Sequence, residues 1–550
     1  MDLLLTCVCL LGLLALALIA RSCGLAGGRA SGKKGDQVVL RPPPEPAGAW
    51  PVVGHLPLLG GKEVAARTLG RMADKYGPVF MLRLGANPTL VISSQEAARD
   101  CFTTCDRDFA SRPRSAAGKH MGYDHSALPL APYGPRWREM RKVATVELLS
   151  PARLEKLRHV RATEVDMRMS ELHQLCEDGG GRPKMVDMGQ WFMDTTFNIV
   201  VRMVASKRYF GGGGEGQQMR RFQKTLSEVV YLMGMFVPSD AVPWLEWLDL
   251  QGHIKAMKRT SKDLDAVLVT WIEEHRQKKR DESGNAEGEQ DFIDVMLSSL
   301  RGVDIAGLDL DTAIKGIVLA LVVGGMETSA VTMTWALALL LNHRLVLDKV
   351  RRELDLHIST TRNVEEKDVP NLVYLQAVVK ETMRLYPVGP LSVPHETTAD
   401  CRVGGYHVPA GTRLLTNLWK LHRDPQVWWP DPEDFRPERF LAGGEAAGVD
   451  VNGQHFGYLP FGSGRRKCPG INLALPVMQL MLARLVHGFE LGTPRGALVD
   501  MGEGLGLALT KKAPLDVLPD HTASALPSLP PLIEYFVFVL VCVSSCVSLT

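Results

Sequence analysis

Apolar side chains recur at helical spacing through most of the chain between residues 151 and 386. Because residues three and four apart share one face of a helix, this spacing predicts amphipathic helices packed on a core. The clearest such stretches are Leu154–Leu175, Met219–Met233 and Asp263–Lys279. Strand signals are short and lie at Val79–Leu84, at Thr89–Ser93 and within residues 406–415. The pattern predicts a mainly α fold with a minor β region.

The longest helical candidate runs from about Asp311 to His343, and its stretch Gly316–Leu341 carries one charge, Glu327. A second membrane span is the alternative. Two glycines, a carboxylate and hydroxyl groups meet at mid-depth in residues 324–329, where a membrane would penalise an unpaired charge. We therefore expect a helix buried in a large core, with a functional interruption at these glycines.

The N-terminus carries a different apolar signal. The segment Leu3–Ala20 carries no charge. It is just long enough to cross a hydrocarbon core of about 30 Å. Asp2 precedes it and basic residues follow from Arg21, so we predict an uncleaved transmembrane signal-anchor over residues 1–21, with the rest cytosolic. A cleaved signal peptide is the alternative.

The rest of the chain divides simply. Residues 22–50 are basic and rich in proline, which predicts a stiff extended connector or a generic linker. Residues 51–519 contain no internal repeat or long linker and form one predicted domain. Residues 520–550 are an atypical tail with no assigned role. The basic run His275–Arg280 is predicted to be a solvated loop.

Composition narrows the function classes. The 550 residues are 45% hydrophobic and 23% charged, as in an ordinary globular protein. The net charge is only +2, so no basic field favours nucleic acid, and we expect no nucleic-acid partner. Ten cysteines without a CxxC pair argue against a disulfide framework and favour reduced thiols.

One cysteine stands in a chemically distinctive segment, Phe461–Gly470, with the sequence FGSGRRKCPG. The glycines allow a tight loop, and Pro469 is suited to the first position of the apolar helix that follows. Cys468 would then lie at a helix N-terminus beside Arg465, Arg466 and Lys467, where dipole and cations favour the thiolate. A buried, inert cysteine is the alternative.

The partners of Cys468 decide what such a thiolate does. A cysteine hydrolase needs a general base, and no histidine is tied to Cys468 by a signature. A structural zinc site needs three further nitrogen or sulfur ligands, and neither a CxxC nor an HxxxH accompanies Cys468. A single strong thiolate instead predicts the axial ligand of a haem iron.

At these residues the chain resembles the cytochrome P-450 monooxygenases. Their haem-binding signature is matched by the phenylalanine, two glycines, arginine and cysteine of the segment: Phe461, Gly464, Arg466, Cys468 and Gly470. Two further segments resemble the family's E-x-x-R helix and P-E-R-F motif. The resemblance implies a buried charged triad of Glu381, Arg384 and Arg439 that supports the haem loop.

The long helix resembles the family's oxygen-activation motif over Gly324–Thr328. The resemblance implies that Thr328 and Glu327 relay protons; a Thr328 hydroxyl bonded to its own helix is the alternative. Trp137 and Arg141 match the W-x-x-x-R helix. With Arg466 and His395 they would neutralise the haem propionates, although His395 in PHET could also be a surface histidine.

The resemblance covers about Pro42 to Leu518 and is closest to plant microsomal members that oxidise flavonoids, alkaloids and homoterpene precursors. It implies a triangular, mostly helical fold around a buried haem b. It also implies that an anchor attaches this fold to the endoplasmic-reticulum membrane. It also implies electrons from NADPH through a diflavin NADPH-cytochrome reductase docking beneath Cys468, with cytochrome b5 as a further candidate donor. Contacts with a hydrophobic small-molecule substrate are expected from residues 111–133, 323–328, 388–393 and 504–507.

The expected activity is insertion of one oxygen atom of O2 into a hydrophobic plant metabolite. Two alternatives stay open: a haem-thiolate isomerase or dehydratase without a reductase, and a haem-binding protein without turnover. Pro476 bears on the second, because a proline within the helix after Cys468 removes a backbone hydrogen bond. We expect it to kink that helix or weaken haem support.

Overall fold

The computed structural model describes residues 41–521, except residues 62, 179–183, 211–216, 236, 243–245, 248, 250, 282–289 and 360–361. The predicted anchor at residues 1–21, the linker up to residue 40 and the tail from residue 522 lie outside the described residues.

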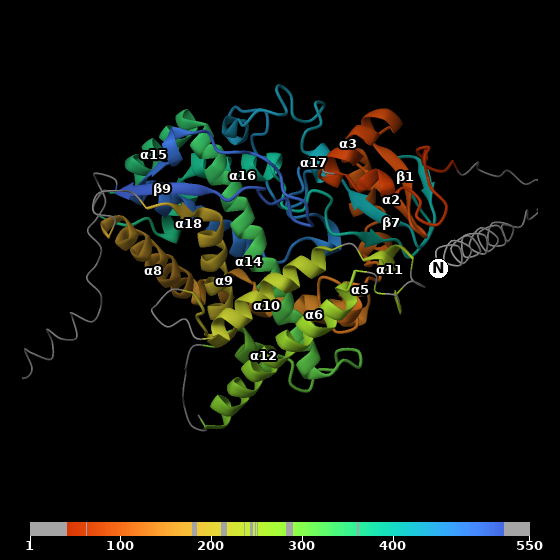
Figure 1. The fold of residues 1–550 in the computed structure, drawn as a ribbon, viewed down its shortest axis with the longest axis horizontal. Helices are drawn as coiled ribbons and strands as arrows, with labels where there is room; N and C mark the ends of the chain where they lie inside the picture. The colour runs from red at the N-terminus through yellow and green to blue at the C-terminus, as the bar shows by residue number, and fades with distance from the viewer. Residues whose placement is uncertain are drawn as a thin grey trace, which may run out of the picture.

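A long central helix organises the fold. This helix, α14 (Leu310–Asn342), packs against α9 (Met188–Ala205), α16 (Val373–Leu385) and α18 (Ile471–Gly488) (Figure 1). It stays helical over all 33 residues, so the expected interruption is wrong. Packing on several sides outweighs the cost of about 1 kcal/mol that a glycine imposes on a helix.

Two described helices, α14 and α18, are long and apolar enough to cross a membrane. In each, 61% of the most apolar window is buried inside the protein. A helix that is apolar all round suits a position in the centre of a large core, where other helices cover it. The structure thus favours the core-helix interpretation of α14 over a second membrane span.

The remaining helices surround this centre (Figure 1). They are α2 (Leu56–Leu59), α3 (Ala65–Tyr76), α4 (Gln95–Phe102), α5 (Ala116–His120), α6 (Pro135–Lys142), α7 (Pro151–Lys156), α8 (Arg158–Glu177), α10 (Gln217–Gly234), α11 (Pro238–Ala241), α12 (His253–Asp281), α13 (Phe292–Ser299), α15 (Arg344–His357) and α17 (Leu418–Leu421). Short 3-10 turns are η1 (Asp108–Ala110), η4 (Glu366–Asn371), η5 (Pro437–Phe440), η6 (Gly464–Arg466) and η7 (Pro494–Gly496), and η2 (Val143–Leu148) is a π-helix.

The predicted helical stretches are confirmed in α7, α8, α10 and α12. The solvated loop predicted for His275–Arg280 is wrong, because these residues form the last turns of α12. His275 is buried. It continues the apolar face of Leu268, Trp271 and Ile272 at spacings of three to seven residues, so the helix extends through the basic run.

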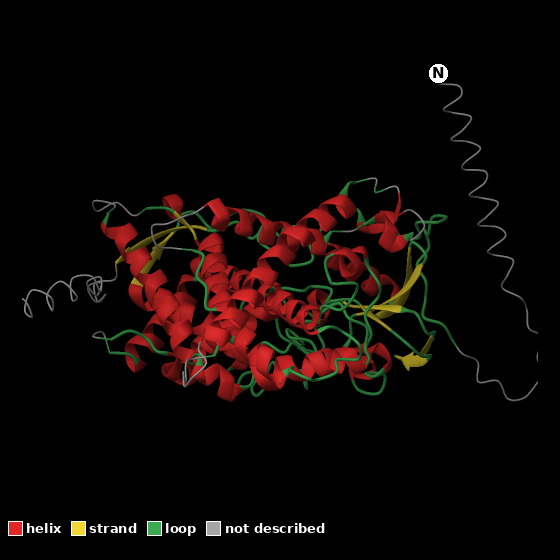
Figure 2. Ribbon diagram, turned by 90° about the horizontal axis from the view of Figure 1, so that it is seen from below, coloured by secondary structure: helices red, strands yellow, loops and turns green. Residues whose placement is uncertain are grey.

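Strands gather at two ends of the helical body (Figure 2). In the larger sheet the order is β1-β2-β7-β4, with β1 antiparallel to β2 and β2 parallel to β7. The predicted strands are thereby confirmed. The sheets comprise β1 (Val79–Leu84), β2 (Asn87–Ile92), β7 (Arg413–Thr416) and β4 (His395–Glu396); β3 (Val186–Asp187), β9 (Asp516–His521) and β8 (Phe489–Gly492); and β5 (Cys401–Val403) with β6 (Tyr406–Val408).

The described part of the proline-rich segment lies against the domain. The Pro44 carbonyl accepts the Met81 N–H over 2.9 Å, and the Arg41 carbonyl accepts that of His407 over 2.9 Å. Because proline fixes the backbone in an extended form, these carbonyls can accept hydrogen bonds from the neighbouring strands. Residues 41–44 are therefore bound to the strands β1 and β6 rather than forming a free linker.

Candidate functional site

The loop that carries Cys468 is held in an unusual backbone path. Gly462 and Gly464 have φ of 69° and 63°, values that favour glycine. The helix α18 begins at Ile471 with Gly470 as its N-cap, so Pro469 precedes the helix. The prediction that Pro469 is the first helical residue is wrong, because the chain first turns through Pro469 and Gly470.

This turn brings a backbone donor to the sulfur. The Gly470 N–H donates to Cys468 Sγ over 3.4 Å, and the Cys468 N–H donates to the Phe461 carbonyl over 2.9 Å. Phe461 itself packs partly buried on the main core. The two hydrogen bonds close the loop on both sides of Cys468, which is a free, half-buried cysteine.

The protonation of Cys468 differs from the sequence-based expectation. Burial raises the pKa of its thiol above the ordinary value, while the Gly470 N–H and the charges of Arg141 and Lys467 lower it by less. The prediction that dipole and cations alone favour a thiolate is therefore wrong, because desolvation outweighs them. A thiolate at this position requires a stronger positive charge, such as a bound metal ion.

The helix α6 supports one side of the loop. The Arg466 guanidinium lies 4.2 Å above the ring of Trp137, and it donates to the carbonyls of Ala110 and Ala131, each over 2.6 Å. Trp137 is buried, and Arg141 donates to the Lys467 carbonyl, next to Cys468. The structure thus brings the predicted residues of α6 together with the cysteine loop.

Two further basic residues lie beside Arg466. His395 is buried rather than on the surface, and its Nδ1 lies 2.7 Å from the Phe109 carbonyl. Arg112, which sequence reasoning missed, is buried and donates to the carbonyls of Val393 and Pro394, each over 2.7 Å. Its only sequence signal is an Arg-Pro pair shortly after Phe109.

Burial lowers the pKa of the basic groups in this cluster. Burial lowers the pKa of Arg466 to about 8 and that of Arg112 to about 9. Burial and the charge of Arg112 also lower the pKa of His395 well below its usual value, so the imidazole is neutral at pH 7. Among the described residues, no carboxylate pairs with Arg112, Arg141 or Arg466.

Buried cations without a counter-ion are costly, so this cluster suits an anionic group. The two propionates of haem meet that requirement, and a single cysteine sulfur suits axial coordination of its iron. The residues present therefore fit a haem. The predicted charge of His395 would need the propionates themselves to raise its pKa.

A cavity of about 30 Å³ lies next to this cluster. Polar and apolar groups from the α4, β4, β7, α17 and cysteine-loop segments line it: Phe102, Ser392, His395, Thr416, Leu418, Leu459, Gly462, Ser463 and Arg466. Its position places His395, Arg466 and the glycines of the loop on one common space.

The predicted charged triad is assembled in the core. Arg384 donates two hydrogen bonds to Glu381, over 2.7 and 2.8 Å, and Arg439 approaches the same carboxylate within 3.4 Å. All three side chains are at most 1% exposed. Arg439 also donates to the carbonyls of Pro430 and Asp431. The triad therefore fixes the segment of chain that precedes the cysteine loop.

His422 connects the triad to the loop, and sequence reasoning missed it. Its carbonyl accepts Arg384 over 2.9 Å, while its Nε2 accepts the Leu459 N–H over 2.9 Å. Burial lowers the pKa of His422 to about 3, so the ring remains neutral and can accept that N–H. Leu459 lies two residues before Phe461, at the start of the signature.

The glycines of α14 have separate tasks. A Cβ on Gly325 would lie 2.9 Å from Val200 Cγ2 on α9, whereas a Cβ on Gly324 would meet nothing within 4 Å. Gly324 and Thr328 are exposed although they lie mid-helix in the core. This side of α14 is therefore open to a bound group, while the Gly325 side packs on α9.

The hydroxyl of Thr328 donates to the Gly324 carbonyl over 2.7 Å, the bond to its own helix that was the alternative interpretation. Burial raises the pKa of the Glu327 carboxyl above its ordinary value. Both groups lie beside the open side of the helix, so their proton-relay role stays a prediction.

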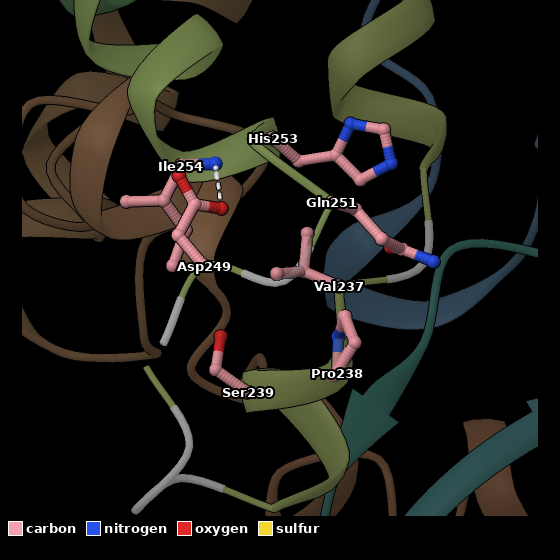
Figure 3. Close-up of a pocket in the computed structure, with 7 residues that line it drawn as sticks. All are labelled: Val237, Pro238, Ser239, Asp249, Gln251, His253 and Ile254. Carbon is pink, nitrogen blue, oxygen red and sulfur yellow. Dashed lines mark hydrogen bonds between the residues drawn. The ribbon is translucent and has the colours of Figure 1, made fainter. Parts of the chain in front are cut away.

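A second cavity lies between α11 and the start of α12 (Figure 3). Asp249 Oδ1 and Oδ2 accept the N–H groups of Ile254 and Lys255 over 3.0 and 2.9 Å. These hydrogen bonds cap the N-terminus of α12, so the Asp249 carboxylate has a structural role. We therefore place the functional site at Cys468.

Comparisons with known proteins agree with this geometry. The cytochrome P-450 family model matches residues 42–518. Xanthotoxin 5-hydroxylase from Arabidopsis thaliana is 51% identical over 484 residues, which are 86% of this chain and 92% of that protein. Flavonoid-6-hydroxylase from Ocimum basilicum is 47% identical over 501 residues, with 89% and 91% covered. Strychnine-10-hydroxylase from Strychnos nux-vomica is 44% identical over 513 residues, with 92% and 96% covered.

A solved structure of a zebrafish cytochrome P-450 with progesterone matches the fold with a TM-score of 0.70 at 25% identity. It covers 84% of this chain and 100% of that one. The family match and the hydroxylases among the relatives both agree with the signature around Cys468. This chain belongs to the cytochrome P-450 family and is a cytochrome P-450 monooxygenase.

Proposed function

We propose that the protein inserts one oxygen atom of O2 into a hydrophobic plant secondary metabolite, with electrons from NADPH through a diflavin reductase. The observation that carries this proposal is the cysteine loop beside a buried cationic cluster that has no carboxylate partner in the described part of the chain. Haem bound there supplies the redox chemistry by which one oxygen atom enters the substrate and the other leaves as water.

The chain's own residues hold and orient that group. Cys468 offers the axial sulfur, and Arg112, Arg141 and Arg466 offer guanidinium groups to the propionates. The triad of Glu381, Arg384 and Arg439 holds the chain before the loop, through the carbonyls of His422, Pro430 and Asp431. We assign proton transfer to the Thr328 hydroxyl and the Glu327 carboxyl, which lie beside the open side of α14; burial raises the pKa of that carboxyl.

The substrate is proposed to be lipophilic or aromatic. Of the segments expected to contact it, Val393, Leu505 and Leu507 are exposed in the protein alone. Apolar side chains of this kind line pockets for small hydrophobic ligands, with few polar groups. The names of the relatives add xanthotoxin, flavonoids and strychnine as substrate classes to test.

The protein is proposed to act at the endoplasmic-reticulum membrane with its domain in the cytosol. Large apolar side chains are exposed near the N-terminal end of the domain, at Trp50 and Leu58, and beyond α11 at Trp247. The Gly85 N–H donates to the Val53 carbonyl over 3.1 Å and the Ala86 N–H donates to the Ala241 carbonyl over 2.9 Å, so the turn between β1 and β2 joins these two regions of chain. Aromatic rings suit the interface of a bilayer.

The test begins with the ligand. Purified full-length protein, loaded with haem and reduced under carbon monoxide, should show the red-shifted Soret band of a thiolate ligand, and Cys468→Ser should lose it. The protein would then receive NADPH, reductase, O2 and each of xanthotoxin, a flavonoid panel and strychnine. Oxygen-dependent hydroxylated product supports the proposal. A thiolate band without such product from any class would favour an isomerase, a dehydratase or a non-catalytic haem protein.

A further inference from the structure

A carboxylate from a distant part of the chain lies against the cysteine loop. Asp106 follows α4 and precedes η1, and its Oδ1 accepts the backbone N–H of Arg465 over 3.0 Å. Its Oδ2 lies 3.2 Å from the Arg465 Nε. One carboxylate thus binds both the backbone and the side chain of a residue three positions before Cys468.

The neighbouring glycine is shaped around this carboxylate. A Cβ on Gly464 would lie 2.1 Å from Asp106 Oδ1, and the φ of 63° at Gly464 also disfavours any other residue. Asp106 therefore occupies the space that a side chain at position 464 would need. The glycine of the signature and the carboxylate of Asp106 form one fitted contact.

We propose that Asp106 is a positioning residue that fixes the path of the loop into Cys468, and so holds the sulfur at the iron. The proposal rests on the axial role of Cys468 given above. Through Arg465, Asp106 orients the turn η6 (Gly464–Arg466), which lies inside the loop that the Phe461 and Gly470 hydrogen bonds close.

The two contacts of Asp106 act on different parts of Arg465, its backbone and its side chain. The bond to the Arg465 N–H acts on the backbone and so on the position of the sulfur. The ion pair with the Arg465 guanidinium does not involve the backbone of the loop. The Arg465 side chain is 48% exposed, so solvent weakens this ion pair. Positioning should therefore depend on the backbone bond more than on the ion pair.

Four variants separate these contributions. Asp106→Ala removes both contacts, Asp106→Asn keeps an acceptor without the charge, and Arg465→Ala removes only the ion pair. Asp108→Asn is the matched control, because the Asp108 carboxylate forms no hydrogen bond with a described residue. Each haem-loaded full-length protein would be reduced with dithionite under carbon monoxide, so that no reductase is needed. The measured quantity is the ratio of thiolate-type to non-thiolate-type Soret absorbance during a urea titration.

Asp106→Ala should lower this ratio roughly tenfold relative to Asp108→Asn, the factor that corresponds to about 1.4 kcal/mol for one charge-assisted hydrogen bond. Asp106→Asn should lie between the two, with its thiolate band lost at a lower urea concentration than in Asp108→Asn. Arg465→Ala should match Asp108→Asn. If Asp106→Ala does not fold, the order of the other three variants decides.

The proposal is overturned if Asp106→Ala or Asp106→Asn keeps its thiolate band at the same urea concentration as Asp108→Asn. It is equally overturned if Arg465→Ala reproduces the whole effect, since the contact would then be only an ion pair. Failure of the axial role of Cys468 is distinguishable, because in that case Cys468→Ser would leave the wild-type spectrum unchanged. Failure of the monooxygenase activity alone is distinguishable as well, because the thiolate band would then remain while no hydroxylated product forms.

Discussion

Arg384 and Glu381 form a double hydrogen bond, over 2.7 and 2.8 Å, between two side chains that are both fully buried. Removing one partner leaves an uncompensated buried charge. We expect Glu381→Ala to lower the free energy of unfolding of the haem-loaded protein by about 3–5 kcal/mol, measured by denaturant titration.

The exposed pair of Arg83 and Glu45 is the control for this prediction. Its atoms approach within 2.7 Å, but the side chains are 58% and 41% exposed. Arg83→Ala should therefore change the free energy of unfolding by less than about 1 kcal/mol. Equal losses for the buried and the exposed variant would contradict the structural role of the triad.

Gly324 and Gly325 are adjacent in α14 and should respond oppositely to alanine. Gly325→Ala places a methyl group 2.9 Å from Val200 Cγ2, a stiff β-branched side chain, and should destabilise the haem-free protein by about 1–3 kcal/mol. Gly324→Ala meets no atom within 4 Å, so it should raise helix stability by up to about 1 kcal/mol. Thermal unfolding of both variants measures this, and the same sign for both would be the contrary result.

Gly324→Ala also narrows the open side of the helix. We therefore expect it to shift the Soret band and slow substrate turnover of the haem-loaded enzyme although the fold is not weakened. Unchanged turnover would show that the open side of α14 does not face the bound group.

Thr328 tests the proton-relay role. Thr328→Ser keeps the hydroxyl that donates to Gly324, whereas Thr328→Val removes it at nearly the same shape. If the hydroxyl relays protons, Thr328→Val should lower the product formed per NADPH roughly tenfold or more, while Thr328→Ser retains most of it. Equal yields from both variants would leave only the hydrogen bond to Gly324 as its function.

The parts predicted from the sequence are those with local signals. The glycine-rich loop around Cys468 and the short apolar strands β1 and β2 depend on residues close together in the chain, and the resemblance supplied the triad. Asp106 and Arg465 lie 359 residues apart, and no local pattern pairs them. Arg112 and His422 were missed for the same reason, since long-range folding creates their contacts.

Protonation was predicted less well than position. The cations beside Cys468 are visible in the sequence. Its desolvation depends on how tightly the loop packs, and desolvation has the largest effect on the pKa of the thiol. The basic run that ends α12 shows the same limit. Its charges predicted a loop, while the apolar face that continues to His275 is completed only by contact with other helices.

His275 gives the fold a pH-dependent contribution. Its Nδ1 lies 2.6 Å from the Trp271 carbonyl and its Nε2 lies 2.8 Å from Asp291 Oδ2, so a doubly protonated ring satisfies both acceptors. Burial lowers the pKa of His275, but the hydrogen bond and charge of Asp291 raise it more, and the pKa lies above 6.5. The stabilisation is therefore complete below the unfolded pKa and is lost as pH rises through the raised folded pKa.

The measurement compares His275→Gln with wild type. The difference in their free energies of unfolding should be largest near about pH 6 and shrink toward about pH 9. The double variant Asp291→Asn/His275→Gln is compared with Asp291→Asn alone to control for other titrating groups. The His275–Asp291 ion pair is absent from both of these proteins. A difference that does not change with pH would contradict a charged His275.

Pro476 lies inside α18, which continues as a helix from Ile471 to Gly488. Asn472, whose carbonyl loses its partner to the proline, is exposed, so water can satisfy that carbonyl and the cost is smaller than in a buried helix. We expect Pro476→Ala to stabilise the protein by about 1–3 kcal/mol in denaturant titration while leaving the carbon monoxide spectrum unchanged. If Pro476→Ala instead restored a thiolate band that wild type lacks, the weakened helix would favour a haem protein impaired in turnover.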